Sequence, residues 1–152
     1  MTNMNTTPEN QTAVAEIQTL MDRWLRDVKA ADIDKLMSHY APDVLAFDAA
    51  LQLQFKGTEA YGKHWRACME MCPGPVTYEM HQLQITAGED VAFAHYLNRC
   101  GGIDDETGEE RAAWMRGTGC FRRIAGNWKI VHEHFSAPFD METFKALLDL
   151  KP

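Results

Sequence analysis

The chain has 152 residues, of which 45% are hydrophobic and 24% charged, so it fits one folded domain and lies far from the composition of disordered proteins. Its net charge of -7 and pI near 5.3 repel phosphate backbones and anionic lipid surfaces, so we expect no nucleic-acid and no membrane partner. The first residues lack the basic and apolar regions of a secretory signal, which predicts a cytoplasmic protein.

Hydrophobic spacing predicts three helices in the first half of the chain. Residues 1–11 read as a flexible tail, and residues 13–30 repeat apolar side chains every three or four positions, as an amphipathic helix does. Asp32 is the expected N-cap of a short second helix, and Thr58 that of a third helix that ends before residue 73.

The sequence of the second half of the chain predicts an antiparallel sheet. Two short apolar segments, near residues 44–48 and 53–55, precede the third helix and read as strands. Four longer extended segments follow it, separated by turn residues, and they predict a meander. The long segments span residues 76–86, 91–101, 111–124 and 127–137, and residues 141–152 are expected to form a short closing helix or tail.

Four cysteines are expected to remain reduced, because thiols seldom form disulfides inside the cell. Cys68 and Cys72 are four positions apart on a predicted helix and therefore share one face. A structural zinc site needs four good ligands, and no matching second pair is evident. We therefore expect these cysteines to pack, and we expect no metal and no cofactor.

Three phrases of the sequence carry a family resemblance: residues 30–34 (AADID), residues 40–44 (YAPDV), and residues 128–138 (WKIVHEHFSAP). Together with the order of elements, they resemble the nuclear transport factor 2-like superfamily over about residues 12–139. That group includes ketosteroid isomerase, SnoaL-like cyclases and a kinase association domain. The resemblance implies an α+β, cone-shaped fold over residues 12–140, with three N-terminal helices packed on a strongly curved antiparallel sheet around one pocket. It also implies a homodimer formed through the outer face of the sheet.

The resemblance to the isomerases can be followed residue by residue. Asp48 falls where they keep their general-base aspartate, whereas Trp24 and Gly119 fall where they keep two hydrogen-bond donors for the developing oxyanion. The ketosteroid isomerase is a worked example of this arrangement. Loss of both donors argues against a steroid isomerase mechanism, although the indole N–H of Trp24 could still serve as one donor.

Two histidines near the C-terminus are the other candidate catalytic residues. Because side chains alternate along a strand, His132 and His134 are expected to share the pocket face with Trp128 and Ile130. Near neutral pH they could act as acid and base, or they could bind a metal together with Asp48. The alternative is that they bond the sheet to a neighbouring loop.

These residues predict a pocket for a small-molecule ligand. The leading hypothesis is an enzyme of the SnoaL-like or isomerase-like type, in which Asp48 and a histidine move a proton on an apolar carbonyl compound. The alternative is a non-catalytic ligand-binding or oligomerisation domain. Ligand sites are mostly apolar with few polar groups, and the expected ligand-binding residues are Trp24, Tyr40, Phe47, Tyr61, Trp65, Phe121 and Ser136.

Overall fold

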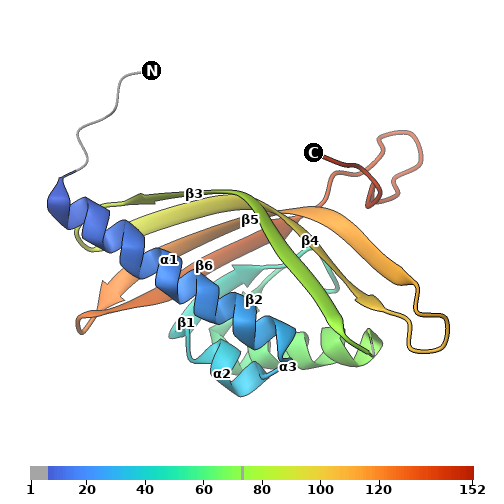
Figure 1. Cartoon of the computed structure of the whole chain (residues 1–152), viewed down its shortest axis with the longest axis horizontal. Helices are drawn as coiled ribbons and strands as arrows, with labels where there is room; N and C mark the ends of the chain where they lie inside the picture. Colours follow the sequence, from blue (N-terminus) through green and yellow to red (C-terminus); the bar gives the residue numbers. More distant parts are fainter. Residues whose placement is uncertain (1–6, 73) are drawn as a thin grey trace.

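The computed structural model describes residues 7–72 and 74–152. Within these residues the chain forms an α+β domain in which helices precede the long strands (Figure 1). The helices are α1 (Pro8–Lys29), α2 (Ile33–Met37) and α3 (Gly57–Met71). The strands are β1 (Tyr40–Phe47), β2 (Phe55–Lys56), β3 (Val76–Ala87), β4 (Val91–Ile103), β5 (Glu110–Ile124) and β6 (Asn127–Ser136).

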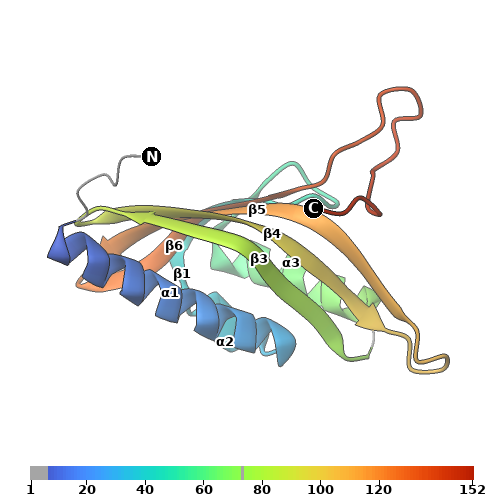
Figure 2. The same cartoon turned by 45° about the horizontal axis from the view of Figure 1, so that its top comes forward.

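The strands of the described residues form one sheet of six in the order β2-β1-β6-β5-β4-β3. The long strands β3 to β6 pair antiparallel as the predicted meander, whereas β1 runs parallel to β6. The sheet curves, with α1 beside β3 on its concave side and α3 against β1 (Figures 1 and 2). The predicted fold of helices on a curved sheet is therefore confirmed, with one parallel pair in place of a wholly antiparallel sheet.

The first two helices begin at side-chain caps. Thr7 accepts a hydrogen bond from the backbone of Asn10, and Pro8 occupies the first turn, where its missing N–H costs nothing. The prediction of a flexible tail over residues 1–11 was therefore wrong from Pro8 onward, and residues 1–6 lie outside the described residues. Asp32 caps α2 as expected, by accepting from the backbone of Lys35.

Two other local predictions were wrong. The third helix begins one residue before Thr58, with Lys56 in the cap position and no side-chain cap. Residues 141–150 form turns instead of the expected helix, with one bridge between Phe139 and Ala146. This segment is mostly exposed, and a short helix without tertiary packing is marginal in water.

A bulge in β6 decides which side chains face the helices. Ile130 pairs with Phe121 of β5 and His132 pairs with Cys120, so Val131 has no partner in β5. An extra residue in one strand moves all the following side chains to the opposite face. The alternation that is correct before the bulge is therefore inverted after it.

The core lies between the inner face of α1 and the concave face of the sheet. Ile17, Trp24 and Val28 of α1 are almost fully buried against residues of the long strands. After the bulge in β6, Glu133 and Phe135 join this core. None of the helices in the described part of the chain is both long and apolar enough to cross a membrane.

Candidate functional site

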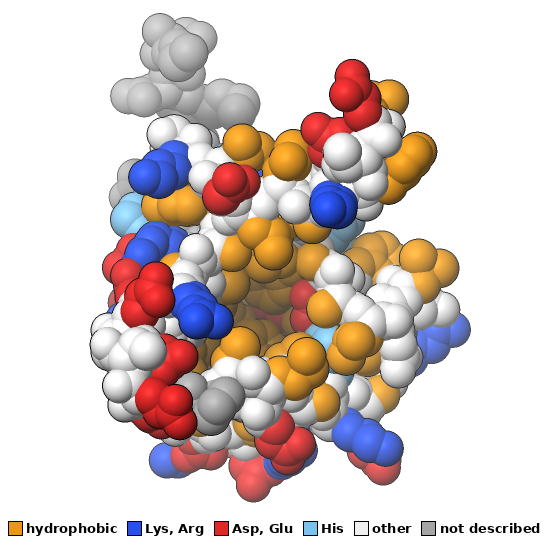
Figure 3. Space-filling view, turned by 90° about the vertical axis from the view of Figure 1, so that its right-hand side faces the viewer, with side chains coloured by type: hydrophobic (Ala, Val, Ile, Leu, Met, Phe, Trp, Pro, Cys, Tyr) orange, Lys and Arg blue, Asp and Glu red, His pale blue; other side chains and the backbone are white. Residues whose placement is uncertain are grey.

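A cavity of about 250 Å³ opens between α3 and the concave face of the sheet. Figure 3 shows a hollow whose wall is mostly hydrophobic, interrupted by acidic and histidine side chains on one side. Trp65 and Met69 of α3 face Tyr78 of β3 and Met115 of β5 across it, and Asp48 supplies a carboxylate. A compact apolar space with few polar groups is the usual form of a small-molecule site.

A larger depression of about 500 Å³ lies beside the first residues of β6 and has a more polar wall. Its Arg123 is already paired with Glu16 and lies over the ring of Trp128, 4.5 Å from the ring centroid. Its Lys129 donates to the Ser38 carbonyl. These charged groups serve the protein's own contacts, so the apolar cavity is the better candidate.

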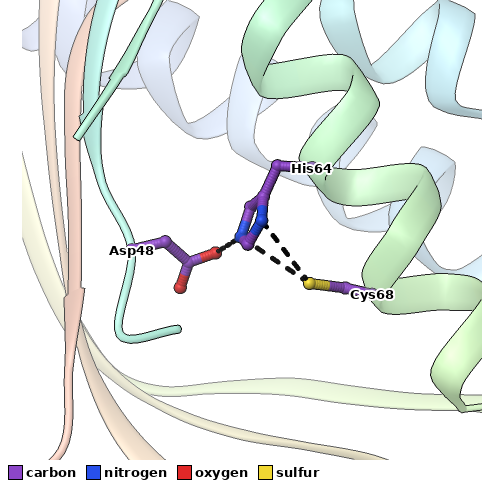
Figure 4. Close-up of side chains that lie close together, drawn as sticks. All are labelled: Asp48, His64 and Cys68. Carbon is purple, nitrogen blue, oxygen red and sulfur yellow. Dashed lines mark hydrogen bonds and ion pairs between the residues drawn. The ribbon is translucent and has the colours of Figure 1, made fainter. Parts of the chain in front are cut away.

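Asp48 and His64 form a hydrogen-bonded pair at the cavity wall. Asp48 follows the last residue of β1, and its Oδ2 lies 2.5 Å from Nε2 of His64 on α3 (Figure 4). Its Oδ1 accepts a bond of 2.6 Å from the backbone of Ala49. The ring of Phe55 stacks on His64, with centroids 4.0 Å apart, and the His64 side chain is only 2% exposed. The Asp48 carboxylate therefore lines the cavity, and the buried His64 imidazole holds this carboxylate by a hydrogen bond.

Cys68 lies one helical turn beyond His64 on the same face of α3. Its Sγ is 3.6 Å from Nε2 of His64, and it lines the cavity (Figure 4). Burial raises the pKa of the Cys68 thiol, and the negative charge of Asp48 raises it further. One donor atom from each of the three residues lies within 4.8 Å of the other two.

A second polar cluster is buried behind the cavity, around Glu133. The hydroxyl groups of Tyr40 and Tyr61 donate to Oε2 of Glu133 at 2.8 and 2.7 Å, and Nε1 of Trp24 donates to the Tyr40 oxygen at 2.7 Å. Burial raises the pKa of Glu133 to about 7, although both tyrosine bonds oppose the shift and Asp48 adds to it. Glu133 therefore changes its charge near neutral pH inside the core.

Two residues that line the cavity carry buried polar atoms without partners. Nε1 of Trp65 and Oδ1 of Asn98 make no hydrogen bond to any described residue. An unpaired buried polar atom costs about 1–3 kcal/mol relative to a paired one. A ligand with a hydrogen-bond acceptor and a donor could recover that cost.

The structure separates Asp48 from the two predicted histidines. His132 and His134 lie on the outer face of the sheet, so the prediction that they face the pocket was wrong, because the bulge at Val131 inverts the alternation. Nδ1–H of His132 donates to the Leu45 carbonyl at 2.6 Å, which is the sheet-bonding alternative.

The predicted ligand-binding residues divide in the same way. Trp65 lines the cavity, whereas Phe47 packs on the outer face against both histidine rings, and Ser136 accepts there from Arg116. The remaining four, Trp24, Tyr40, Tyr61 and Phe121, are buried in the core.

The sequence interpretation missed His64 and Glu133. His64 shares a helical face with Cys68, at a spacing of four residues, which was the signal available. Glu133 gave no such signal, because simple alternation places it on the outside.

Residues 17–140 match the family model of the SnoaL-like domain. The chain belongs to the SnoaL-like family. No curated protein matches its sequence.

Solved structures place this SnoaL-like chain in the nuclear transport factor 2-like superfamily, as its resemblance implied. One is an NTF2-like protein of unknown function from Pseudomonas putida KT2440, with 51% identity and a TM-score of 0.87, covering 93% of this chain and 98% of that one. Another, from Salmonella enterica, is an NTF2-like superfamily protein with 17% identity and a TM-score of 0.73, covering 90% and 99%. A third, provisionally named a dehydratase, is from Streptomyces avermitilis, with 16% identity and a TM-score of 0.73, covering 84% and 97%. The last two likenesses are in fold alone.

Proposed function

We propose that this SnoaL-like protein is an enzyme that moves a proton on a compact, apolar carbonyl compound, with Asp48 as the general base. The observation that carries the proposal is the Asp48–His64 pair at the wall of an otherwise apolar cavity. A carboxylate that faces a substrate from such a wall is oriented and poorly solvated, which favours proton transfer.

Each residue of the site has a role in this proposal. Asp48 removes a proton from the carbon next to the carbonyl group, and His64 keeps the carboxylate oriented through its Nε2–H. The developing negative charge on the substrate oxygen needs a donor. The unpaired indole N–H of Trp65 is the candidate for that role, whereas the unpaired Oδ1 of Asn98 is an acceptor and could bind a hydroxyl group of the substrate. Isomerase, cyclase and dehydratase reactions all share this first step, and one structural neighbour carries the name of a dehydratase.

A non-catalytic ligand-binding role is the second candidate, and one observation favours it. Neither isomerase donor position supplies a free donor, because Gly119 has no side chain and the N–H of Trp24 is bonded to Tyr40. Without donors at those two positions, a cavity can bind a ketone and leave its reactivity unchanged. The two candidates differ in whether the bound compound exchanges protons.

Deuterium uptake tests the proposal without knowledge of the natural substrate. Cyclohexenone, indanone and tetralone are incubated with the protein in deuterium oxide, and exchange beside the carbonyl is followed by proton NMR. We expect accelerated exchange, and a loss of at least ~100-fold in Asp48→Asn, because the amide cannot take a proton. The amide oxygen can keep only one of the two bonds that the carboxylate accepts, from His64 or from Ala49, so the melting temperature should fall slightly, and circular dichroism verifies that the variant is folded at the assay temperature.

Asp43→Asn is the matched control, since Asp43 is an exposed aspartate of β1, the strand that Asp48 follows. It should exchange at the wild-type rate. If none of the ketones exchanges above the buffer rate, the enzyme proposal is wrong and the binding alternative stands. If exchange persists in Asp48→Asn, Asp48 is not the base.

A further inference from the structure

We propose that Asp48, His64 and Cys68 together form a binding site for a zinc-like divalent cation, with one coordination position open to the cavity. Nothing in the family match assigns a metal to this chain. This proposal rests on how near the three donor atoms lie to one another, on the helical spacing of His64 and Cys68, and on the chemical types of the donors.

The three donor atoms lie within 4.8 Å of one another at the cavity wall. Oδ2 of Asp48 lies 2.5 Å from Nε2 of His64, whereas Sγ of Cys68 lies beside the ring, 3.6 Å from Nε2 and 3.9 Å from Nδ1 (Figure 4). In a cysteine–histidine–carboxylate relay, the carboxylate and the thiol address opposite nitrogens of the imidazole. Here the thiol is bonded closely to neither nitrogen, and His64 and Cys68 are four positions apart on one helix face, a spacing at which two side chains can share a cation.

A tetrahedral site would require two of the three side chains to move. Zinc bonds of about 2.0–2.3 Å place neighbouring ligand atoms roughly 3.4 Å apart. The Sγ–Nε2 distance of 3.6 Å has this length, but Sγ lies beside the ring, so the Cys68 side chain must turn toward the front of Nε2. The Oδ2–Nε2 distance is 2.5 Å, because these two atoms share a proton, so the carboxylate of Asp48 must move by about 1 Å to admit an ion. Asp48 lies at the end of a strand with its side chain 17% exposed, and it has room to do so.

The donor set and its surroundings suit zinc. Carboxylate, imidazole and thiolate are all zinc ligands, and three protein ligands with a free fourth position are typical of catalytic zinc sites. Asp48 and Cys68 both line the cavity, so the fourth position would face a bound compound. The ring of Phe55 holds the imidazole in place. On binding, the Cys68 thiol releases its proton to solvent and the ion gains a thiolate.

This inference does not rest on the proposed proton transfer. Coordination would occupy the Asp48 carboxylate, so a bound cation would replace it as the reactive group. Metal binding is measured without any substrate, so its failure and the failure of the enzyme proposal are distinguishable.

Cobalt titration tests the site, because Co²⁺ reports its ligands through its absorption. The full chain is treated with a chelator, dialysed and titrated with Co²⁺. We expect one equivalent to produce a near-ultraviolet sulfur-to-cobalt band and the strong visible bands of four-coordinate cobalt. Zn²⁺ should bleach both, and its affinity follows from competition with a chromophoric chelator.

Cys68→Ser should abolish the sulfur band and weaken Zn²⁺ binding by about 100-fold or more. Cys72→Ser is the matched control, since Cys72 is a thiol of the same cavity one turn away, and it should leave the spectrum and the affinity unchanged. Circular dichroism verifies that both variants fold. The site is wrong if cobalt shows only its weak six-coordinate spectrum, if Cys68→Ser keeps the sulfur band, or if Cys72→Ser loses it.

Discussion

Glu133 is a carboxyl group whose properties are set by its place in the core. Its side chain is buried, and two tyrosine hydroxyls donate to the same oxygen. Burial disfavours the charged form more than these bonds favour it, so the pKa of Glu133 rises to about 7. The chain therefore has a buried group that ionises near neutral pH.

This shift predicts how stability depends on pH. Between about pH 4.5 and 7 the folded protein keeps the Glu133 proton, whereas the unfolded chain has lost it, so the folded state binds more protons. The contribution of Glu133 to the free energy of unfolding therefore falls as pH rises through this window, by about 3 kcal/mol. Above about pH 7 Glu133 is ionised in both states, and its contribution to the free energy of unfolding falls no further.

Glu133→Gln tests the sign, because its amide stays neutral and its oxygen can still accept from the tyrosines. We expect the variant's free energy of unfolding, minus that of the wild type, to rise by about 3 kcal/mol between pH 4.5 and pH 8. Urea unfolding across this range measures the difference, and other titrating groups cancel. A difference that does not change with pH would show that Glu133 ionises normally.

At the scale of elements, the pairing of β4 with β5 closes one end of the cavity. Gly101 of β4 lines the cavity and pairs with Ala112 of β5. A Cβ at this position would lie 1.8 Å from the carbonyl oxygen of Arg111, which is backbone and cannot rotate away. The close approach of the two strands here depends on glycine.

Gly101→Ala should therefore force β4 away from β5. We expect a loss of about 1–3 kcal/mol in the free energy of unfolding, typical of overpacking, and a lower melting temperature. The neighbouring Gly102→Ala is the control, because its added Cβ would meet only ordinary contacts at 3.5 Å. Thermal melts compare the two, and equal stability of both variants would contradict the argument.

At the scale of the whole molecule, the outer face of the sheet carries exposed apolar side chains. Val91 and Phe93 of β4 are 59% and 47% exposed there. The C-terminal segment covers part of the same face, where the Leu148 carbonyl accepts from the backbone of Trp114. The homodimer expected from the family resemblance remains a prediction. Its interface would cover the part of the outer face that the C-terminal segment leaves exposed.

Phe93→Asp places a charge in this face and should convert a dimer to a monomer, because an unpaired charge is costly at a buried interface. Sedimentation at micromolar concentration measures the molecular mass. Leu53→Asp is the control, since Leu53 is 91% exposed in the loop before β2, and it should remain dimeric. A monomeric wild-type protein would refute the prediction, and a dimeric Phe93→Asp would place the interface elsewhere.

The sequence by itself determined what depends on short-range periodicity. Apolar spacing located α1, alternation and turns located the four long strands, and Asp32 identified the cap of α2. These features depend on neighbours within a few positions, so they can be read without the fold. The family resemblance then supplied the curvature of the sheet and pointed to Asp48.

Only the tertiary structure decided which polar side chains meet. Because Val131 has no partner in β5, Glu133 lies on the inner face of the sheet in place of His132. The sequence of β6 contains no pattern that predicts this bulge. Asp48 and His64 are sixteen positions apart and on different elements, so their pair exists only once α3 packs against β1. Alternation fixes faces only while pairing is regular, and contacts between elements depend on how the whole chain closes.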